Sequence, residues 1–226
     1  MNLDESYIDS LREKAEQALT VGDIPKVILI FQEMEQAGVW QITARIAELY
    51  ETGYKHDKCE FKRDLEEAAK WYRKSIFESD DPIAHLGLGR MYFEGSVTVK
   101  RDVAQAQIHL NKAYINDVPQ AGIYLGIMSM FGVGSEKNLE EAEQFFLTAA
   151  TGGFPLAYRY LASIAISSGK PFYAIKMLIK GFFLTMRLKI QDRNHPNLWG
   201  VGESWSSDVL EFRRTHDNAV KRNAAK

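Results

Sequence analysis

The feature that most constrains this chain is a residue pattern that returns three times along its middle. Ala68, Ala106 and Ala142 occupy equivalent positions, so successive copies lie 38 and 36 residues apart. A polar residue precedes each alanine by four positions. A fixed period of this length predicts a repeat architecture, in which each unit buries its apolar face against its neighbours.

Each copy predicts two helices joined by a short turn. Residues 84–95 follow the pattern Ala-x-x-x-Leu-Gly-x-x-Tyr-x-x-Gly, with related segments at 46–53 and 121–132. Small and apolar residues at this spacing form one close-packing stripe on a helix. The terminal glycine suits a helix C-terminus, and the following Asp or Asn suits the next N-cap. The repeat signature comprises Ala47, Tyr50, Gly53, Asp64, Ala68, Gly89, Tyr92, Gly95, Asp102, Ala106, Gly126, Gly132, Asn138 and Ala142.

The pattern predicts an all-α fold and excludes a sheet in the middle of the chain. We expect a helical repeat domain over 1–190, with units at about 3–39, 40–82, 83–119, 120–155 and 156–190. Pro82, Pro119 and Pro155 fall just before or at the start of the next unit, where they end one helix and favour a turn. Residues 191–226 lack the pattern, and we expect an irregular C-terminal capping segment with a mildly basic tail.

These residues resemble the Sel-1-like repeat family, relatives of tetratricopeptide repeats. The resemblance covers residues 40–190 and weakens in the last unit, where Ser168-Gly169-Lys170-Pro171 replaces the signature. It implies a right-handed α-solenoid of about five antiparallel helix pairs. It also implies that the first helix of each pair lines a concave wall, on which such proteins bind other proteins.

We expect a partner peptide or helix to bind in this concave groove. Its wall should be apolar at mid-length and charged at its flanks, which is the composition of interface hot spots. An alternative is that some side chains of this wall belong to the core. In that case Met130 and Phe131 pack between repeats, and Arg90 pairs with Glu94. The candidate partner-binding residues are Glu48, Arg90, Phe93, Glu94, Ile123, Ile127, Met130, Phe131 and Arg159.

The segment from Pro171 to Ile190 predicts an apolar helix that something must cover. Its three cations, Lys176, Lys180 and Arg187, interrupt the run, so it does not match the uncharged stretch of about 20 residues that spans a bilayer. We expect a fold-back of the C-terminal segment to cover this helix. The competing interpretation is a homodimer or partner interface there. The side chains expected to fold back are Trp199, Trp205, Val209 and Phe212.

Composition and motifs do not favour catalysis, metals or cofactors. Cys59 is the only cysteine, and no two of the five histidines share a metal-ligand spacing. Residues 56–59, His-Asp-Lys-Cys, imitate a two-ligand metal site, but we expect them to form an inserted surface loop with no third group. The formal net charge of −2 provides no general attraction to nucleic acid or acidic membranes. An acidic amino terminus and a lone cysteine lead us to expect a cytoplasmic protein.

We therefore predict a non-catalytic adaptor or regulatory scaffold that binds a protein partner and needs no cofactor. One alternative is an immunity or inhibitor protein that neutralises a toxin or enzyme through the same groove. Another is a β-lactam hydrolase, an activity credited to some Sel-1-like proteins. Those proteins are rich in paired cysteines, which this chain lacks, so the resemblance disfavours that activity.

Overall fold

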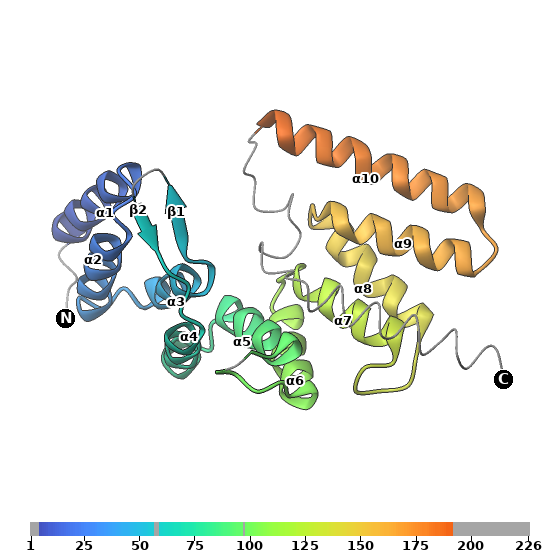
Figure 1. Cartoon of the computed structure of the whole chain (residues 1–226), viewed down its shortest axis with the longest axis horizontal. Helices are drawn as coiled ribbons and strands as arrows, with labels where there is room; N and C mark the ends of the chain where they lie inside the picture. The colour runs from blue at the N-terminus through green and yellow to red at the C-terminus, as the bar shows by residue number, and fades with distance from the viewer. Residues whose placement is uncertain (1–4, 57–58, 97, 192–226) are drawn as a thin grey trace. The chain divides into compact units, whose positions relative to one another are not determined.

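The computed structural model describes residues 5–56, 59–96 and 98–191, which form mainly α-helices (Figure 1). By its internal contacts the chain divides into two compact units, Met1–Thr148 and Ala149–Lys226, which are described separately. The elements are α1 (Glu5–Thr20), α2 (Ile24–Gln36), the 3-10 helix η1 (Trp40–Ile42), α3 (Thr43–Thr52), β1 (Tyr54–His56), β2 (Cys59–Phe61), α4 (Leu65–Ser79), α5 (Pro82–Glu94), α6 (Val103–Ile115), α7 (Ala121–Phe131), α8 (Leu139–Thr151), α9 (Pro155–Ser167) and α10 (Pro171–Gln191).

Consecutive helices pack in pairs, which confirms the all-α repeat class. Helix α1 packs on α2, α3 on α4, α5 on α6, and α9 on α10. Figure 1 shows α9 and α10 lying side by side within the second unit. Within the first unit, contacts of α2 with α3, α4 with α5 and α6 with α7 join the pairs into a continuous stack. Each pair therefore buries its apolar face against the next one.

The predicted caps are present at both ends of the paired helices. The Asp64 carboxylate accepts hydrogen bonds from the backbone N–H groups of Glu66 and Glu67, both at 3.0 Å. Asp102 and Asn138 cap α6 and α8 in the same way. Gly95 ends α5 with φ 73° and ψ 164°, a conformation open almost only to glycine. These local interactions explain why the helices begin and end where the signature predicts.

A backbone hydrogen bond closes the turn between the two helices of each central unit. The N–H of the N-cap residue donates to a carbonyl in the preceding helix. The bonds are Asp64 N to Tyr50 O at 2.8 Å, Asp102 N to Tyr92 O at 2.9 Å, and Asn138 N to Ser129 O at 2.8 Å. The acceptors occupy the same signature position in all three units. The bond therefore holds the two ends of the turn together although the turns differ in length.

The turn between α3 and α4 differs from the loop that we expected there. Strands β1 and β2 form a two-stranded antiparallel hairpin, with Tyr54 opposite Phe61 and His56 opposite Cys59. The expectation of no sheet in the middle of the chain was wrong at this point. The hairpin is an addition to the turn of one repeat, and the paired helices on either side of it are unchanged in type.

Small residues on the first helices allow the close approach that the pattern predicts. A Cβ atom added to Gly126 would lie 2.7 Å from Cε1 of Phe146 on α8, and one added to Gly89 would lie 2.8 Å from Cγ of Leu110 on α6. Phe146 and Leu110 are both fully buried. The glycines therefore fix the spacing between the two helices of a pair.

The last helix of the described residues is α10, which is apolar on two sides. Ala174, Met177, Gly181 and Leu188 are buried, whereas many large apolar side chains of the same helix are exposed. None of the helices in the described part of the chain is long and apolar enough to cross a membrane. The side chains expected to cover α10 lie outside the described residues. They are Trp199, Trp205, Val209 and Phe212.

Candidate functional site

The first helices of the central units, α3, α5 and α7, carry most of the predicted binding residues. Phe93, Ile123 and Ile127 are only 7%, 0% and 6% exposed. Phe93 packs edge-on against the ring of Tyr124, with ring centroids 5.8 Å apart. The exposure that we expected for these three residues is not found in the structure. These three side chains belong to the core, as the alternative expectation for part of the wall allowed.

The remaining predicted residues are less buried. Met130 and Phe131 are half-buried in the last turn of α7. Glu48 on α3 is half-buried, and it accepts a hydrogen bond from the Arg45 guanidinium at 2.7 Å. Arg159 is exposed on α9, in the second unit.

Arg90 is the centre of a buried polar cluster. Its Nε donates to Oε1 of Glu51 at 2.9 Å, and a second guanidinium nitrogen pairs with Oε2 of the same carboxylate. The Tyr72 hydroxyl also donates to Oε2 of Glu51, at 2.6 Å. Burial, and then the Glu51 charge, hold the pKa of Tyr72 well above its ordinary value, so the hydroxyl remains a donor. Arg90 thus pairs with Glu51 of the preceding repeat. The alternative expectation, in which Arg90 pairs with Glu94, is not what the structure shows.

Glu94 lies beside this cluster with an unmatched oxygen. Its Oε1 atom is buried and has no hydrogen-bond partner among the described residues. Burial raises the pKa of Glu94 to about 7, against the opposing effect of the Arg90 charge. Because Glu51 already neutralises Arg90, the guanidinium does not bring the carboxyl back to its ordinary pKa. Glu94 is therefore poised between its neutral and ionised forms near neutral pH.

Tyr124 adds a second buried polar group to the same cluster. Its side chain is fully buried in α7, and its hydroxyl lacks a described hydrogen-bond partner of normal geometry. Burial raises the pKa of Tyr124 well above its ordinary value, and the nearby Arg90 charge opposes the rise. Buried polar atoms without partners are rare in folded proteins, and each one calls for an explanation. We name Glu51, Arg90, Glu94 and Tyr124 the inner polar cluster.

A histidine pair forms a separate polar cluster in the unit of α5 and α6. Nδ1 of His85 lies 2.7 Å from Nδ1 of His109, and Nε2 of His85 lies 2.8 Å from a carboxylate oxygen of Asp80. Only one proton fits between the two Nδ1 atoms. Since Nε2–H of His85 donates to Asp80, the neutral pair requires His109 to donate its Nδ1–H to His85. Burial, and then the His85 charge, lower the pKa of His109 to about 4.

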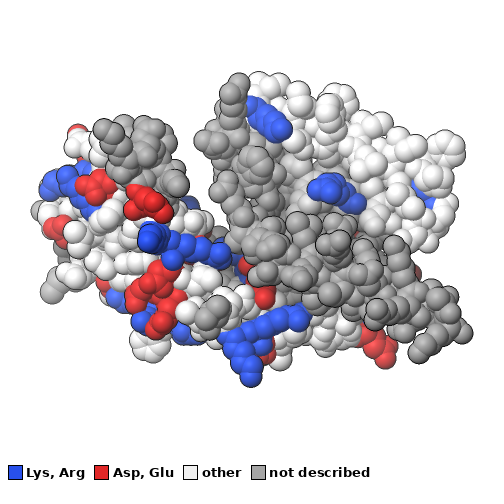
Figure 2. All heavy atoms as spheres, in the orientation of Figure 1, with Lys and Arg blue, Asp and Glu red and all other residues white. Residues whose placement is uncertain are grey.

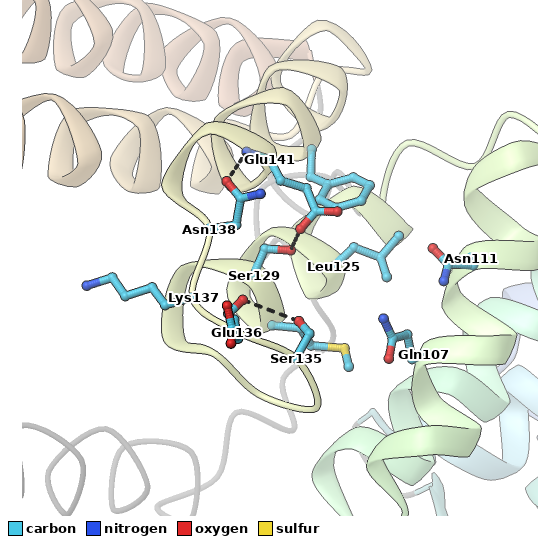
Figure 3. A pocket seen from close by; sticks show the side chains of 11 residues that line it. Gln107, Asn111, Leu125, Ser129, Ser135, Glu136, Lys137, Asn138 and Glu141 are labelled. Atoms are coloured by element: carbon cyan, nitrogen blue, oxygen red, sulfur yellow. Dashed lines mark hydrogen bonds between the residues drawn. The ribbon is translucent and has the colours of Figure 1, made fainter.

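A polar pocket of about 390 Å³ lies between α6, α7, α8 and the turn before α8 (Figure 3). Its polar groups largely stabilise local structure. Asn138 caps α8, and the Ser129 hydroxyl donates to Glu141 at 2.7 Å, as the dashed lines show. No serine in the lining is paired with a histidine, and no group of three metal-ligating side chains occurs among the described residues.

The comparisons with known proteins identify the repeat. The Sel1 repeat family matches the chain at residues 44–76, 82–117 and 119–154. These ranges contain α3 with α4, α5 with α6, and α7 with α8. Residues 44–154 of this chain therefore carry three Sel1 repeats, which confirms the resemblance drawn from the sequence.

Curated relatives match only part of this chain. A Sel1-like repeat-containing protein of Schizosaccharomyces pombe is 30% identical over 99 residues, 44% of this chain and 14% of the relative. Chitin synthase regulatory factor 3 of the same yeast is 28% identical over 142 residues, 61% of this chain and 15% of that protein. Alginate biosynthesis protein AlgK of Pseudomonas syringae is 38% identical over 92 residues, 41% of this chain and 19% of that protein. This chain thus spans less than a quarter of the length of these relatives.

Solved structures share the fold over most of the chain. A Sel1 repeat protein from Oxalobacter formigenes superposes with a TM-score of 0.64 and 23% identity, covering 92% of this chain and 84% of that one. A protective antigen of uropathogenic Escherichia coli with an SLR fold superposes with a TM-score of 0.61 and 19% identity, covering 96% of this chain and 47% of that one. At this level of identity the similarity establishes the fold alone.

Proposed function

We propose that this protein is a non-catalytic interaction scaffold, and that a partner segment binds at the inner polar cluster through a basic group. Sel1 repeats typically mediate protein interactions, which supports the scaffold part of the proposal. The observation that carries the rest is the unmatched, buried Oε1 of Glu94 beside an ion pair that is already complete. In this proposal, a partner supplies the hydrogen-bond donor that Oε1 of Glu94 lacks.

The charges of the cluster define the chemistry of the partner group. Arg90 and Glu51 neutralise each other, which leaves the Glu94 carboxyl with a buried oxygen that has no partner among the described residues. A lysine ammonium or arginine guanidinium donates to this carboxyl and balances its charge. The half-buried Met130 and Phe131 lie on α7, the helix that carries Tyr124, and they offer apolar contact to the residues flanking that basic group.

This pairing makes binding depend on pH in a defined direction. Glu94 attracts a cation only when it is ionised, and burial raises its pKa to about 7 in the free protein. Affinity should therefore rise between pH 6 and pH 8, and binding should release a proton from Glu94. The Glu94→Gln variant should show no such rise.

The experiment is a selection of random displayed peptides on the immobilised protein, followed by affinity measurements with synthetic peptides. We expect the selected peptides to share a lysine or arginine, and Glu94→Gln to weaken them at least about tenfold. Replacing the basic residue of the peptide by glutamine should cost nothing further in the Glu94→Gln variant. Glu140→Gln, at an exposed carboxylate in the first turn of α8, is the matched control.

Two outcomes would contradict the proposal. One is a selection whose peptides carry no shared basic residue. The other is equal affinity of the Glu94→Gln and Glu140→Gln variants for the selected peptides. Far-ultraviolet circular dichroism of both variants checks that each is folded, so a loss of binding is not mistaken for unfolding.

A further inference from the structure

Helix α10 carries three separate stripes of side chains. The buried stripe, Ala174, Met177, Gly181 and Leu188, faces α9, where a Cβ added to Gly181 would lie 2.9 Å from Cβ of Tyr158. The opposite side of the helix is apolar and exposed, which is unusual for a surface helix. We call it the outer face; it comprises Phe172, Ile175, Ile179, Phe182, Phe183, Met186 and Ile190.

The outer face is large and solvent-exposed in the part of the chain that the structure describes. Phe172 is 87% exposed and Ile190 is 82% exposed, and they lie near opposite ends of a 21-residue helix about 31 Å long. Contiguous apolar surface of this extent marks an interface, because leaving it in water is unfavourable. Figure 2 shows the surface over α10 as mainly white with isolated blue groups. The terminal helix of a repeat stack normally needs a polar cap there.

The charges of α10 indicate what chemistry covers it. The helix contains four basic residues and no acidic one. Lys176, Lys180 and Arg187 form a stripe along one edge of the outer face, at positions i, i+4 and i+11. An occupant should therefore be apolar and acidic, since a complementary charge pattern sets register and excludes wrong partners.

A segment of the same chain has this composition. Residues 198–212, Leu-Trp-Gly-Val-Gly-Glu-Ser-Trp-Ser-Ser-Asp-Val-Leu-Glu-Phe, contain three acidic residues, no lysine or arginine, and seven large apolar residues. They lie outside the described residues and follow α10 after a connection of six residues, 192–197. Six extended residues reach about 20 Å, which is enough for the chain to turn back along the helix.

A second copy of this chain fits the outer face less well. Two α10 helices packed face to face would bring together eight basic residues without any acidic partner from either helix. In an antiparallel pair, the two stripes of Lys176, Lys180 and Arg187 would lie along the same edge of the interface. Like charges placed side by side in an interface disfavour it.

We propose that residues 198–212 dock on the outer face of α10 and cap the repeat stack within the same molecule. Trp199, Trp205, Val209 and Phe212 supply the apolar contact. Glu203, Asp208 and Glu211 pair with the basic stripe of α10. This contact does not involve the inner polar cluster, so its test is independent of the test of the proposed function.

Hydrogen exchange of the full chain, followed by mass spectrometry, tests this docking. We expect slow exchange in 198–212 and in α10. Reversing two cations with Lys176→Glu and Lys180→Glu should speed exchange of 198–212 by at least about tenfold. Adding Asp208→Lys and Glu211→Lys to that variant should restore slow exchange, because the pairs are re-formed with their signs exchanged. Lys14→Glu with Lys26→Glu, two exposed lysines on α1 and α2, is the matched control.

Three results would overturn the docking. Residues 198–212 could exchange as fast as an unfolded peptide, or their protection could be unchanged by the α10 variants. Light scattering could also show a concentration-dependent dimer that Ile179→Asp converts to a monomer, in which case a second copy covers the outer face. A monomer whose protection follows the charge-exchange pattern supports the proposal.

Discussion

Glu94 shows how the environment of one side chain makes the stability of a protein depend on pH. In an unfolded chain its carboxyl has an ordinary pKa of 4.5, and burial raises the pKa to about 7 in the folded protein. The folded state therefore holds a proton more tightly than the unfolded state. Stability that Glu94 contributes below pH 4.5 is lost as the pH rises through 7.

The first prediction follows from this direction. At pH 8 the Glu94→Gln variant should be more stable than the wild type by about 1 to 3 kcal/mol, because it avoids burying an ionised carboxylate. At pH 4 the two should differ little, since Glu94 is then neutral. Urea unfolding at the two pH values measures the difference. A stability difference that is the same at pH 4 and pH 8 would show that ionisation of Glu94 is not its cause.

His109 should act in the opposite direction. Its pKa is lowered to about 4, so its neutral form is favoured in the folded protein and stability falls as the pH drops from 6.5 towards 4. The charged groups around the pair are Asp80, Lys112 and Arg73. We expect His109→Gln to lose part of this acid sensitivity, measured as the change in unfolding midpoint between pH 7 and pH 4.5. An unchanged acid sensitivity in the variant would contradict the assignment.

At the scale of the helix pair, Gly126 limits how closely α7 and α8 pack. The ring of Phe146 is fully buried, so it has no free space into which it could move away from an added Cβ. Gly126→Ala should therefore destabilise the protein by about 1 to 3 kcal/mol, although alanine favours a helix. Chemical denaturation measures the loss. Gln144→Ala, on the exposed side of α8, is the control and should be nearly neutral.

The helices and their boundaries could be predicted because their signals are local. Asp64, Asp102 and Asn138 cap the helices that they precede, and the small residues lie where the partner helix approaches. The hairpin β1–β2 could not be predicted in this way. It occupies a turn whose length varies between units, and the repeat pattern contains no information about such a turn.

The whole chain should unfold in parts, because each repeat contacts only its neighbours. Leu11 on α1 and Leu88 on α5 are both fully buried leucines, and truncating either to alanine should cost about 2 to 5 kcal/mol. Leu11 lies in the core of the first helix pair, whereas Leu88 packs among side chains of α3 and α4. Leu11→Ala should thus speed hydrogen exchange mainly in α1 and α2.

Leu88→Ala should speed exchange across α3 to α6 and serves as the matched comparison. Mass spectrometry of the exchanged protein resolves the two patterns. If both variants speed exchange equally in every helix, the first unit unfolds as a single cooperative block and the prediction is wrong.

The candidate site could be predicted only in part at this scale. The repeat pattern marks the side of each first helix that packs on its own partner helix, and it leaves Arg90 and Glu94 on another side. It does not show that Phe93, Ile123 and Ile127 are themselves buried, Phe93 with its ring against Tyr124 of the next repeat. The sequence does distinguish Glu51 as a candidate polar residue of this site. It has a carboxylate at the position where the next two repeats have Phe93 and Met130.

The hydrogen bond that closes each inter-helix turn has a practical consequence for protein engineering. Asp64 N–H meets Tyr50 O across a turn that contains a hairpin, and Asn138 N–H meets Ser129 O across a shorter one. The packing of the two helices therefore does not depend on how many residues lie between the two hydrogen-bonded positions. Foreign loops grafted at this point, such as an epitope or a peptide ligand, would be displayed at one rim of the stack without disturbing the register of the repeats.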